Sequence, residues 1–284
     1  MRKENLPREY TDRMKKALGE EFDAFFAEYD KPAVKALRFN TRKVRPETIT
    51  KLTDEWSLTP VPWCKDAYYY EESESLRPGL SPYHDAGVFY IQEPSAMITA
   101  EKAEIVPDDI VLDLCAAPGG KSTQAAAKAK ILVSNEPIAK RARILSSNIE
   151  RMGFDNCIVC SAHPDELAAA FTGFFDKIIV DAPCSGEGMM RKDETAVSEW
   201  SEANVEACIE RQREVLEGAQ HMLKPGGRLI YSTCTFEKGE NEDQVAEFLK
   251  EYPEFRLIEE ETLYPHKIKG EGHFCAVLEK EEDA

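Results

Sequence analysis

Two cysteines follow predicted buried strands and are the side chains best suited to covalent chemistry. The strand predicted at 176–181 leads into Cys184, and the strand predicted at 228–233 leads into Cys234. Because parallel strands of an open α/β sheet end at the same edge, about 4.8 Å from their neighbours, we expect both thiols to face one pocket. A thiol of lowered pKa is a soft nucleophile, although buried cysteine is more often inert packing. Their shared position at strand ends favours the reactive interpretation.

A turn of small residues at the same edge forms the expected ligand floor. It lies between an apolar run that begins at Ile110 and a helix-forming tract. Ligands of open α/β sheets sit beyond the carboxyl ends of the strands, where small residues let the backbone approach them. The turn lacks the glycine spacing of a Walker phosphate loop and of a dinucleotide fingerprint, so a turn needed only for chain reversal stays an alternative. Its residues are Cys115, Ala116, Ala117, Pro118, Gly119, Gly120 and Lys121.

An acidic residue ends the next predicted strand. Glu136 follows the run 131–135 and lies 23 positions after Asp113. A carboxylate at the end of the second strand is placed to accept hydrogen bonds from both hydroxyls of a ribose. A solvated surface glutamate is the alternative, but the turn upstream favours a binding role.

Strand and helix patterns alternate from Pro107 almost to the end of the chain. Strands are predicted at 110–115, 131–135, 157–161, 176–181, 228–233 and 273–278, with a further short strand at 255–258. Helices are predicted near 122–129, 138–152, 204–224 and 241–251, the third ended by Pro225-Gly226-Gly227. This alternation predicts the α/β class, with a doubly wound, mostly parallel sheet over residues 91–284. Residues 1–90, with helical patterning before residue 30 and many prolines after it, predict a small α+β domain.

The composition limits the class of protein. A chain of 284 residues with 42% hydrophobic residues fits a globular domain with an appendage. The charged N-terminus predicts no signal peptide, and no apolar run has membrane-spanning length, so we expect the protein in the cytoplasm. We also expect a monomer. The eight cysteines are then expected to be free thiols. Cys157 and Cys160 are predicted to pack in the core, and no histidine has zinc-ligand spacing, so no metal is expected.

The charge is unevenly distributed. The net charge of −17 argues against general binding to nucleic acid. Residues 1–50, however, carry twelve basic and nine acidic side chains, and the segment 31–45 carries six basic and no acidic ones. Such a run is usually a solvated face. Phe39 and Asn40 within it favour an RNA contact, so residues 1–90 are the expected RNA-recognition domain.

Five motifs together resemble the Sun family of RNA cytosine-C5 methyltransferases, and within it the RsmF type that modifies small-subunit ribosomal RNA. The resemblance covers nearly the whole chain and implies a Rossmann-like fold with S-adenosylmethionine as the methyl donor. The motifs are YIQEPSAM (90–97), LDLCAAPGGKSTQ (112–124), DAPCSGEGMMRKDE (181–194), YSTCTFEKGENE (231–242) and PHKIKGEGHF (265–274).

The resemblance also implies a role for each candidate residue. Cys234 would be the nucleophile that adds to C6 of cytosine, and Cys184 would assist loss of the C5 proton and release of the adduct. Asp181 would lie beside both the cofactor and the base, near N3 of the pyrimidine. The turn 115–121 would form the cofactor loop, with Glu136 on the ribose. Addition of a thiolate makes C5 nucleophilic, which divides one difficult step into two.

The chain departs from the family pattern in two places. The family has an acidic or amide residue near the end of the third strand that contacts adenine, whereas the spacing here puts His163 at that position. Members of the RsmF type usually continue into a PUA-like RNA-binding domain, and this chain stops at Ala284. Three alternatives therefore stay open: a methyltransferase acting on another RNA such as tRNA, a small-molecule methyltransferase, and a non-catalytic RNA-binding assembly factor.

Overall fold

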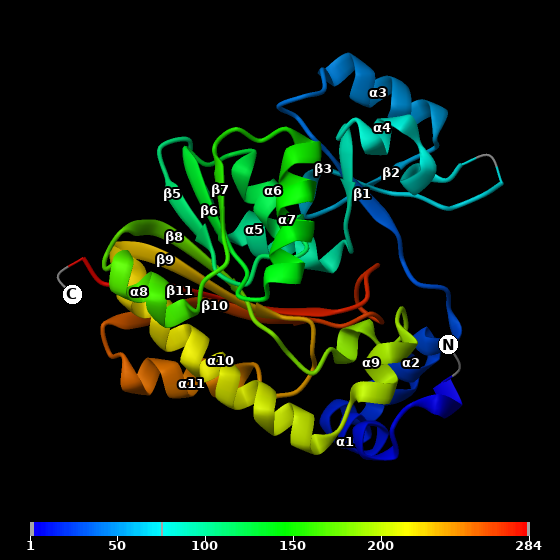
Figure 1. The fold of residues 1–284 in the computed structure, drawn as a ribbon. Coiled ribbons are helices and arrows are strands. Elements are labelled where there is room, and N and C mark those ends of the chain that lie inside the picture. Colours follow the sequence, from blue (N-terminus) through cyan, green and yellow to red (C-terminus); the bar gives the residue numbers. More distant parts are fainter. Residues whose placement is uncertain (1–2, 75, 283–284) are drawn as a thin grey trace.

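The computed structural model describes residues 3–74 and 76–282, which form two β-sheets (Figure 1). The larger sheet has seven strands in the order β10-β11-β9-β8-β5-β6-β7. The five strands from β9 to β7 run parallel, and β11 lies antiparallel between β9 and β10. The strands are β5 (Ile110–Asp113), β6 (Ile131–Asn135), β7 (Cys157–Cys160), β8 (Phe175–Asp181), β9 (Leu223–Thr233), β10 (Phe255–Leu263) and β11 (His273–Lys280).

Helices cover both faces of this sheet, as the doubly wound prediction requires. Alternate residues of β8 point to opposite sides, so Ile178 packs with one set of helices and Ile179 with the other. One face is covered by α8 (Pro164–Ala170), α10 (Glu202–Met222) and α11 (Glu242–Glu251). The other is covered by α5 (Ile98–Lys102), α6 (Gly120–Ala126) and α7 (Ala139–Met152). The predicted fold class is confirmed.

The smaller sheet is antiparallel and has the order β2-β3-β1-β4. It is the α+β unit predicted before residue 91. Leu37 and Phe39 of β1 pack with Leu52 of α3 in a small separate core. The elements are β1 (Ala36–Phe39), α3 (Pro46–Glu55), β2 (Thr59–Val61), β3 (Cys64–Tyr69), α4 (Pro82–Asp85) and β4 (Phe89–Ile91).

The first two helices lie away from the small sheet. Figure 1 shows α1 (Arg8–Leu18) and α2 (Phe22–Ala27), in blue, beside α9 (Glu194–Glu199). Tyr10 and Phe25 form one core with Trp200 and Phe236, which follow β8 and β9 respectively. The N-terminal segment therefore packs against the loops at the carboxyl edge of the large sheet. Whether residues 1–90 form one domain stays a prediction.

Two elements differ in length from the sequence prediction. The helix predicted to end near 224 ends at Met222, and Pro225-Gly226-Gly227 lies in β9 at a break in its register with β8. The strand predicted at 255–258 extends to Leu263 because it pairs with β11 along its length. No helix of the described residues is both long and apolar enough to cross a membrane.

Candidate active site at the carboxyl edge of the large sheet

The two strand-end thiols are in contact. The Sγ atoms of Cys184 and Cys234 lie 3.1 Å apart, and the backbone N–H of Cys234 donates to Sγ of Cys184 over 3.3 Å. The parallel pairing of β8 with β9, which sets Asp181 opposite Ser232, brings the two following loops together. The pKa of Cys184 is raised well above its ordinary value, first by its hydrogen bond with Cys234 and then by burial. The expected convergence of the thiols is confirmed, while their chemical roles stay predictions.

Asp181 lies between two cavities beside the thiols. A cavity of about 580 Å³ is lined by both cysteines and by Asp181, and a second, of about 210 Å³, shares Asp181, Cys115 and Ala117 with it. Both lie beyond the carboxyl ends of the strands, where ligands of open α/β sheets bind. The larger volume is typical of small-molecule sites.

A cation holds Asp181 in its ionised form. Nζ of Lys121 lies 2.7 Å from Oδ2 of Asp181, and Oγ of Ser232 donates to Oδ1 over 3.0 Å. Burial alone would raise the pKa of Asp181, but Lys121, His273 and Ser232 outweigh it, so that the net pKa lies below its ordinary value. Burial would likewise lower the pKa of Lys121, and Asp181 reverses this and raises it. The site therefore carries an adjacent carboxylate and ammonium.

The small-residue turn forms the floor of both cavities. The backbone N–H of Ala116 donates to the carbonyl of Asn135 at the end of β6 over 2.8 Å. Gly119 has a φ of 112°, a left-handed conformation that glycine adopts without strain, and it caps the N-terminus of α6. Arg141 of α7 donates to the carbonyl of Ala117 over 3.2 Å. The turn is thus fixed by β6 and α7 as well as by its own glycines.

Asp113, at the end of β5, is a buried acid beside the smaller cavity. Ser122 donates to its Oδ2 over 2.6 Å, and Oδ1 has no hydrogen-bond partner among the described residues. Burial raises the pKa of Asp113 to about 7, against the effect of the Ser122 hydrogen bond. Buried polar atoms are usually paired, so an oxygen without a partner on a residue that lines the cavity is a candidate contact for a ligand.

Glu136 is buried and faces the larger cavity. Its side chain is 2% exposed, which excludes a solvated surface glutamate. Oε1 accepts from the backbone N–H of Ile138 over 3.0 Å, and Oε2 lies 3.1 Å from Nη1 of Arg141. Its predicted position at the sheet edge is confirmed, and its contact with a ribose stays a prediction.

His163 lies on the rim of the same cavity. Its side chain is 60% exposed, and Nδ1 lies 3.3 Å from Oδ2 of Asp165. The residue precedes α8, and its backbone N–H donates to Glu166 over 2.9 Å. Its suggested contact with adenine stays a prediction.

The side chains fit the cofactor that the resemblance implies. S-adenosylmethionine offers two ribose hydroxyls and a charged amino-acid end, and each needs polar partners. The unpaired oxygen of Asp113 and the buried carboxylate of Glu136 lie at the two cavities on either side of the turn. No group of three or more metal-ligating side chains that could hold an ion is found among the residues described.

Most basic side chains of the segment 31–45 are exposed, but they also make contacts within the protein. Lys31 and Lys35 pair with Glu28 and Glu72. Arg38, Arg42 and Lys43 instead donate to backbone carbonyls, and Arg38 reaches Gly120 at the start of α6 over 3.1 Å. Much of this charge therefore joins the small sheet to the large one. Phe39 and Asn40, which had favoured an RNA contact, are each 1% exposed, so that expectation is wrong for these two side chains because both pack inside the fold. An RNA contact through the exposed basic side chains of the segment stays a prediction.

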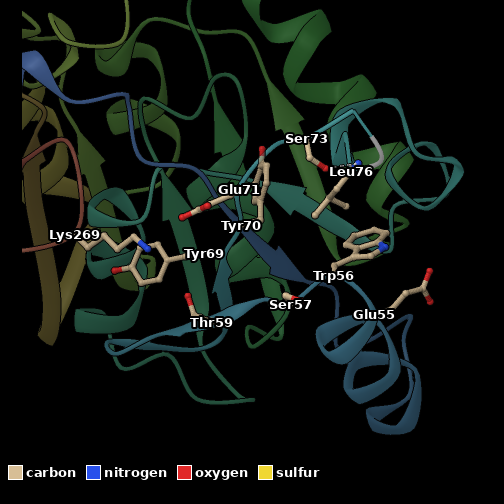
Figure 2. Close-up of a pocket in the computed structure, with 10 residues that line it drawn as sticks. All are labelled: Glu55, Trp56, Ser57, Thr59, Tyr69, Tyr70, Glu71, Ser73, Leu76 and Lys269. Carbon is tan, nitrogen blue, oxygen red and sulfur yellow. Dashed lines mark hydrogen bonds between the residues drawn. The ribbon is translucent and has the colours of Figure 1, made fainter.

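A further cavity of about 510 Å³ lies beside the small sheet (Figure 2). Trp56, Tyr69 and Tyr70 provide aromatic walls, and Nζ of Lys269 lies 4.6 Å from the centre of the Tyr69 ring. Glu55 and Glu71 also line it, so its charge does not favour phosphate. We assign it no part in the chemistry.

Sequence reasoning missed several side chains that support the site. His273 of β11 is buried, with Nε2 3.1 Å from Oγ1 of Thr99 and 3.7 Å from Oδ1 of Asp181. Burial and then Lys121 lower the pKa of His273 to about 3, so the ring is neutral at pH 7. Glu240 is also buried and accepts from the backbone N–H of Ser185 over 3.0 Å. His273 lies in the motif at 265–274 and Glu240 in the motif at 231–242, so membership of these motifs could have indicated both residues.

The sheet order, the antiparallel β11 and the glycine turn define a Rossmann-like methyltransferase fold. Two family models match the chain. The model described as 16S rRNA methyltransferase RsmB/F covers residues 102–279, and the N-terminal domain of 16S rRNA methyltransferase RsmF covers 6–94. The chain belongs to the RsmB/F family of 16S rRNA methyltransferases.

Curated relatives extend beyond this chain. It is 38% identical over 272 residues to ribosomal RNA small subunit methyltransferase F of an Enterobacter species, covering 92% of this chain and 57% of the relative. The protein of the same name from Vibrio parahaemolyticus is 41% identical over 235 residues, which is 80% of this chain and 49% of the relative. The chain thus spans about half the length of these relatives.

Solved structures share the fold over almost the whole chain. A methyltransferase homologue from Pyrococcus horikoshii matches with a TM-score of 0.83 and 26% identity, covering 95% of this chain and 93% of that one. NSun6 from the same organism, solved with SFG, matches with a TM-score of 0.84 and 22% identity over 96% and 98% of the two chains. The second likeness supports the fold alone.

Proposed function

We propose that the protein transfers a methyl group from S-adenosylmethionine to C5 of a cytosine in RNA, with small-subunit ribosomal RNA as the substrate. Membership of the RsmB/F family supports the class of substrate. The observation that carries the cytosine-C5 chemistry is the contact between Cys184 and Cys234 beside Asp181. On this proposal the protein acts in the cytoplasm, where bacterial ribosomal RNA is found.

The cofactor would be held across the small-residue turn. Glu136 would accept hydrogen bonds from the ribose hydroxyls, because its carboxylate is already oriented by Arg141 and the Ile138 N–H. Asp113 would meet the charged amino-acid end with its unpaired oxygen. When bound, S-adenosylmethionine supplies the electrophilic methyl group.

Cys234 is assigned the nucleophilic role. Its thiolate forms a bond to C6 of the cytosine, and electron density moves to C5 and toward N3. On this proposal the resting Cys184 keeps its proton and donates it in a hydrogen bond to the sulfur of Cys234; burial also raises the pKa of Cys184. Cys184 thereby stabilises negative charge on Cys234 before attack.

Asp181 and Lys121 are assigned to the edge of the base. Asp181 is ionised, so it accepts a hydrogen bond from the N4 amino group of cytosine. Lys121 is the adjacent cation that balances negative charge as it spreads toward N3. Fixed charges in a site sheltered from water act more strongly than the same charges in water.

Cys184 completes the reaction as a base. The hydrogen bond with Cys234 is the largest cause of its raised pKa, and that cause disappears once the Cys234 sulfur is bonded to C6. Burial still raises the pKa of Cys184 at that stage, so on this proposal Cys184 gives up its proton to water in the cavity before its thiolate takes the proton from C5. The C5–H electrons re-form the C5=C6 bond, and the Cys234 sulfur leaves as a thiolate.

The test is methylation of defined RNA by the purified protein. Small-subunit ribosomal RNA, a tRNA pool and free cytidine are incubated with methyl-labelled S-adenosylmethionine, and products are mapped by bisulfite sequencing. We expect 5-methylcytosine at a defined site of the ribosomal RNA and none in cytidine. Labelling of tRNA alone would overturn the substrate assignment, and cofactor binding without methylation of any RNA would favour a non-catalytic RNA-binding factor.

A further inference from the structure

The loops after the two cysteines run side by side with equivalent residues in contact. Their sequences are Cys-Ser-Gly-Glu at 184–187 and Cys-Thr-Phe-Glu at 234–237. The first position of each gives the Sγ–Sγ contact. At the second position, Oγ of Ser185 and Oγ1 of Thr235 lie 2.8 Å apart and are buried. The spacing of the thiols therefore depends on how these two loops are held together.

The fourth position of each loop carries a glutamate, and one arginine binds both. Nη2 of Arg13 donates to Oε1 of Glu187, and Nη1 donates to Oε2 of Glu237. Glu187 is fully buried, and it also accepts from the backbone N–H of Phe236 over 3.1 Å. Its carboxylate, on the Cys184 loop, is thus bonded directly to the Cys234 loop.

Arg13 itself is held in place by α1. The guanidinium carbon lies 5.6 Å from the centre of the Tyr10 ring and 5.8 Å from that of Trp200. The indole N–H of Trp200 donates to Oε1 of Glu187 over 2.9 Å. The helix is anchored through Tyr10 and Met14, which are both 1% exposed. The fork of the arginine is therefore fixed before any substrate binds.

We propose that Arg13 is a positioning residue that sets the separation of the two thiols, so that the N-terminal helix is part of the reaction centre. The inference rests on the proposed function for the identity of the reacting groups. A planar guanidinium presents its N–H groups in a fixed fork, which suits it to hold two carboxylates on separate loops at a set distance. Without it, the buried charge of Glu187 lacks its cation, and the two loops keep their direct hydrogen bonds but lose the bridge that fixes the separation of the thiols.

The test compares Arg13→Ala with Arg8→Ala, a matched change on the same helix at a side chain that is 89% exposed. Single-turnover methyl transfer should fall roughly 10- to 100-fold in Arg13→Ala, because small displacements of reacting groups have costs of this size. Affinity for the cofactor should be unchanged, since Arg13 lines neither cavity. Added guanidinium should restore part of the rate, and Arg13→Lys should be intermediate. A general folding defect would not respond to guanidinium.

A second measurement does not depend on turnover. Iodoacetamide alkylation of Cys184 and Cys234, followed by mass spectrometry, should be several-fold faster in Arg13→Ala than in Arg8→Ala. Equal alkylation rates and equal transfer rates in the two variants would overturn the inference while leaving the proposed function intact. If the wild-type protein transfers no methyl group but alkylation still depends on Arg13, the proposed function fails while the positioning role of Arg13 stands.

Discussion

Nζ of Lys121 lies 2.7 Å from Oδ2 of Asp181, between β5 and β8 at the edge of the large sheet. Lys121 is 9% exposed and Asp181 33% exposed. Two other acids lie beside the turn: Glu136, which pairs with Arg141, and Asp113, whose pKa burial raises to about 7. Lys121 therefore supplies the ammonium that balances the charge of Asp181 at this turn.

Removing this cation should destabilise the fold. Lys121→Met leaves Asp181 without its ammonium, and the free energy of unfolding should fall by about 1–3 kcal/mol, a range reduced for the partial exposure of Asp181. Urea unfolding measures it. Arg213→Met removes an exposed pair with Glu247 and should change stability by less than about 1 kcal/mol. Equal losses in the two variants would contradict the assigned importance of the buried pair.

Asp113 should make stability depend on pH. Its pKa is about 7 in the folded protein and about 4 when unfolded. Between these values the folded state keeps a proton that the unfolded state has released, so the contribution of Asp113 falls as pH rises through this window. Relative to Asp113→Asn, the wild type should lose stability from pH 4.5 to pH 8 in urea titrations.

The control for this titration is Asp155→Asn, because the side chain of Asp155 is 98% exposed. The free energy of unfolding of this variant should differ from that of the wild type by the same amount at every pH in this range. A flat difference for Asp113→Asn as well would show that this carboxyl is not held protonated by burial.

Glu136 should determine cofactor affinity. Glu136→Gln removes a charged acceptor at the larger cavity, and the dissociation constant for S-adenosylmethionine should rise roughly tenfold or more. Isothermal titration calorimetry measures this change, with Glu150→Gln, an exposed position on the same helix as Arg141, as the matched variant. Unchanged affinity in Glu136→Gln would remove this residue from the binding site.

The large sheet was predictable because each of its strands is marked by a run of residues that are neighbours in the sequence. Strands such as 131–135 are short apolar runs, and a rule about parallel strands then places Cys184 and Cys234 at one edge. The same rule predicted the position of Glu136, which the side chain of Arg141 in the first turn of α7 helps to cover. The small sheet was predicted only as an α+β unit, since polar residues and proline interrupt its strands, as in Thr-Pro-Val of β2 and in β3, which contains Lys65 and Asp66.

Contacts across long separations could not be predicted. Arg13 meets Glu187 and Glu237 from 174 and 224 positions away, and no periodicity marks it within α1. The charge run 31–45 suggested an exposed face, and its basic side chains are exposed apart from Arg38, which is 3% exposed and joins β1 to the start of α6. The sequence shows which residues of a run are charged, but the packing of the folded chain determines which of those side chains stay exposed.

The covalent step is tested most directly with Cys184→Ala. If Cys234 attacks C6 and Cys184 is needed for release, this variant, incubated with substrate RNA and S-adenosylmethionine, should accumulate a protein–RNA adduct on a denaturing gel. Mass spectrometry should map the adduct to Cys234, and Cys184→Ala combined with Cys234→Ala should form none. Methylation of the RNA at the normal rate by Cys234→Ala, or an adduct on any other residue, would contradict the account.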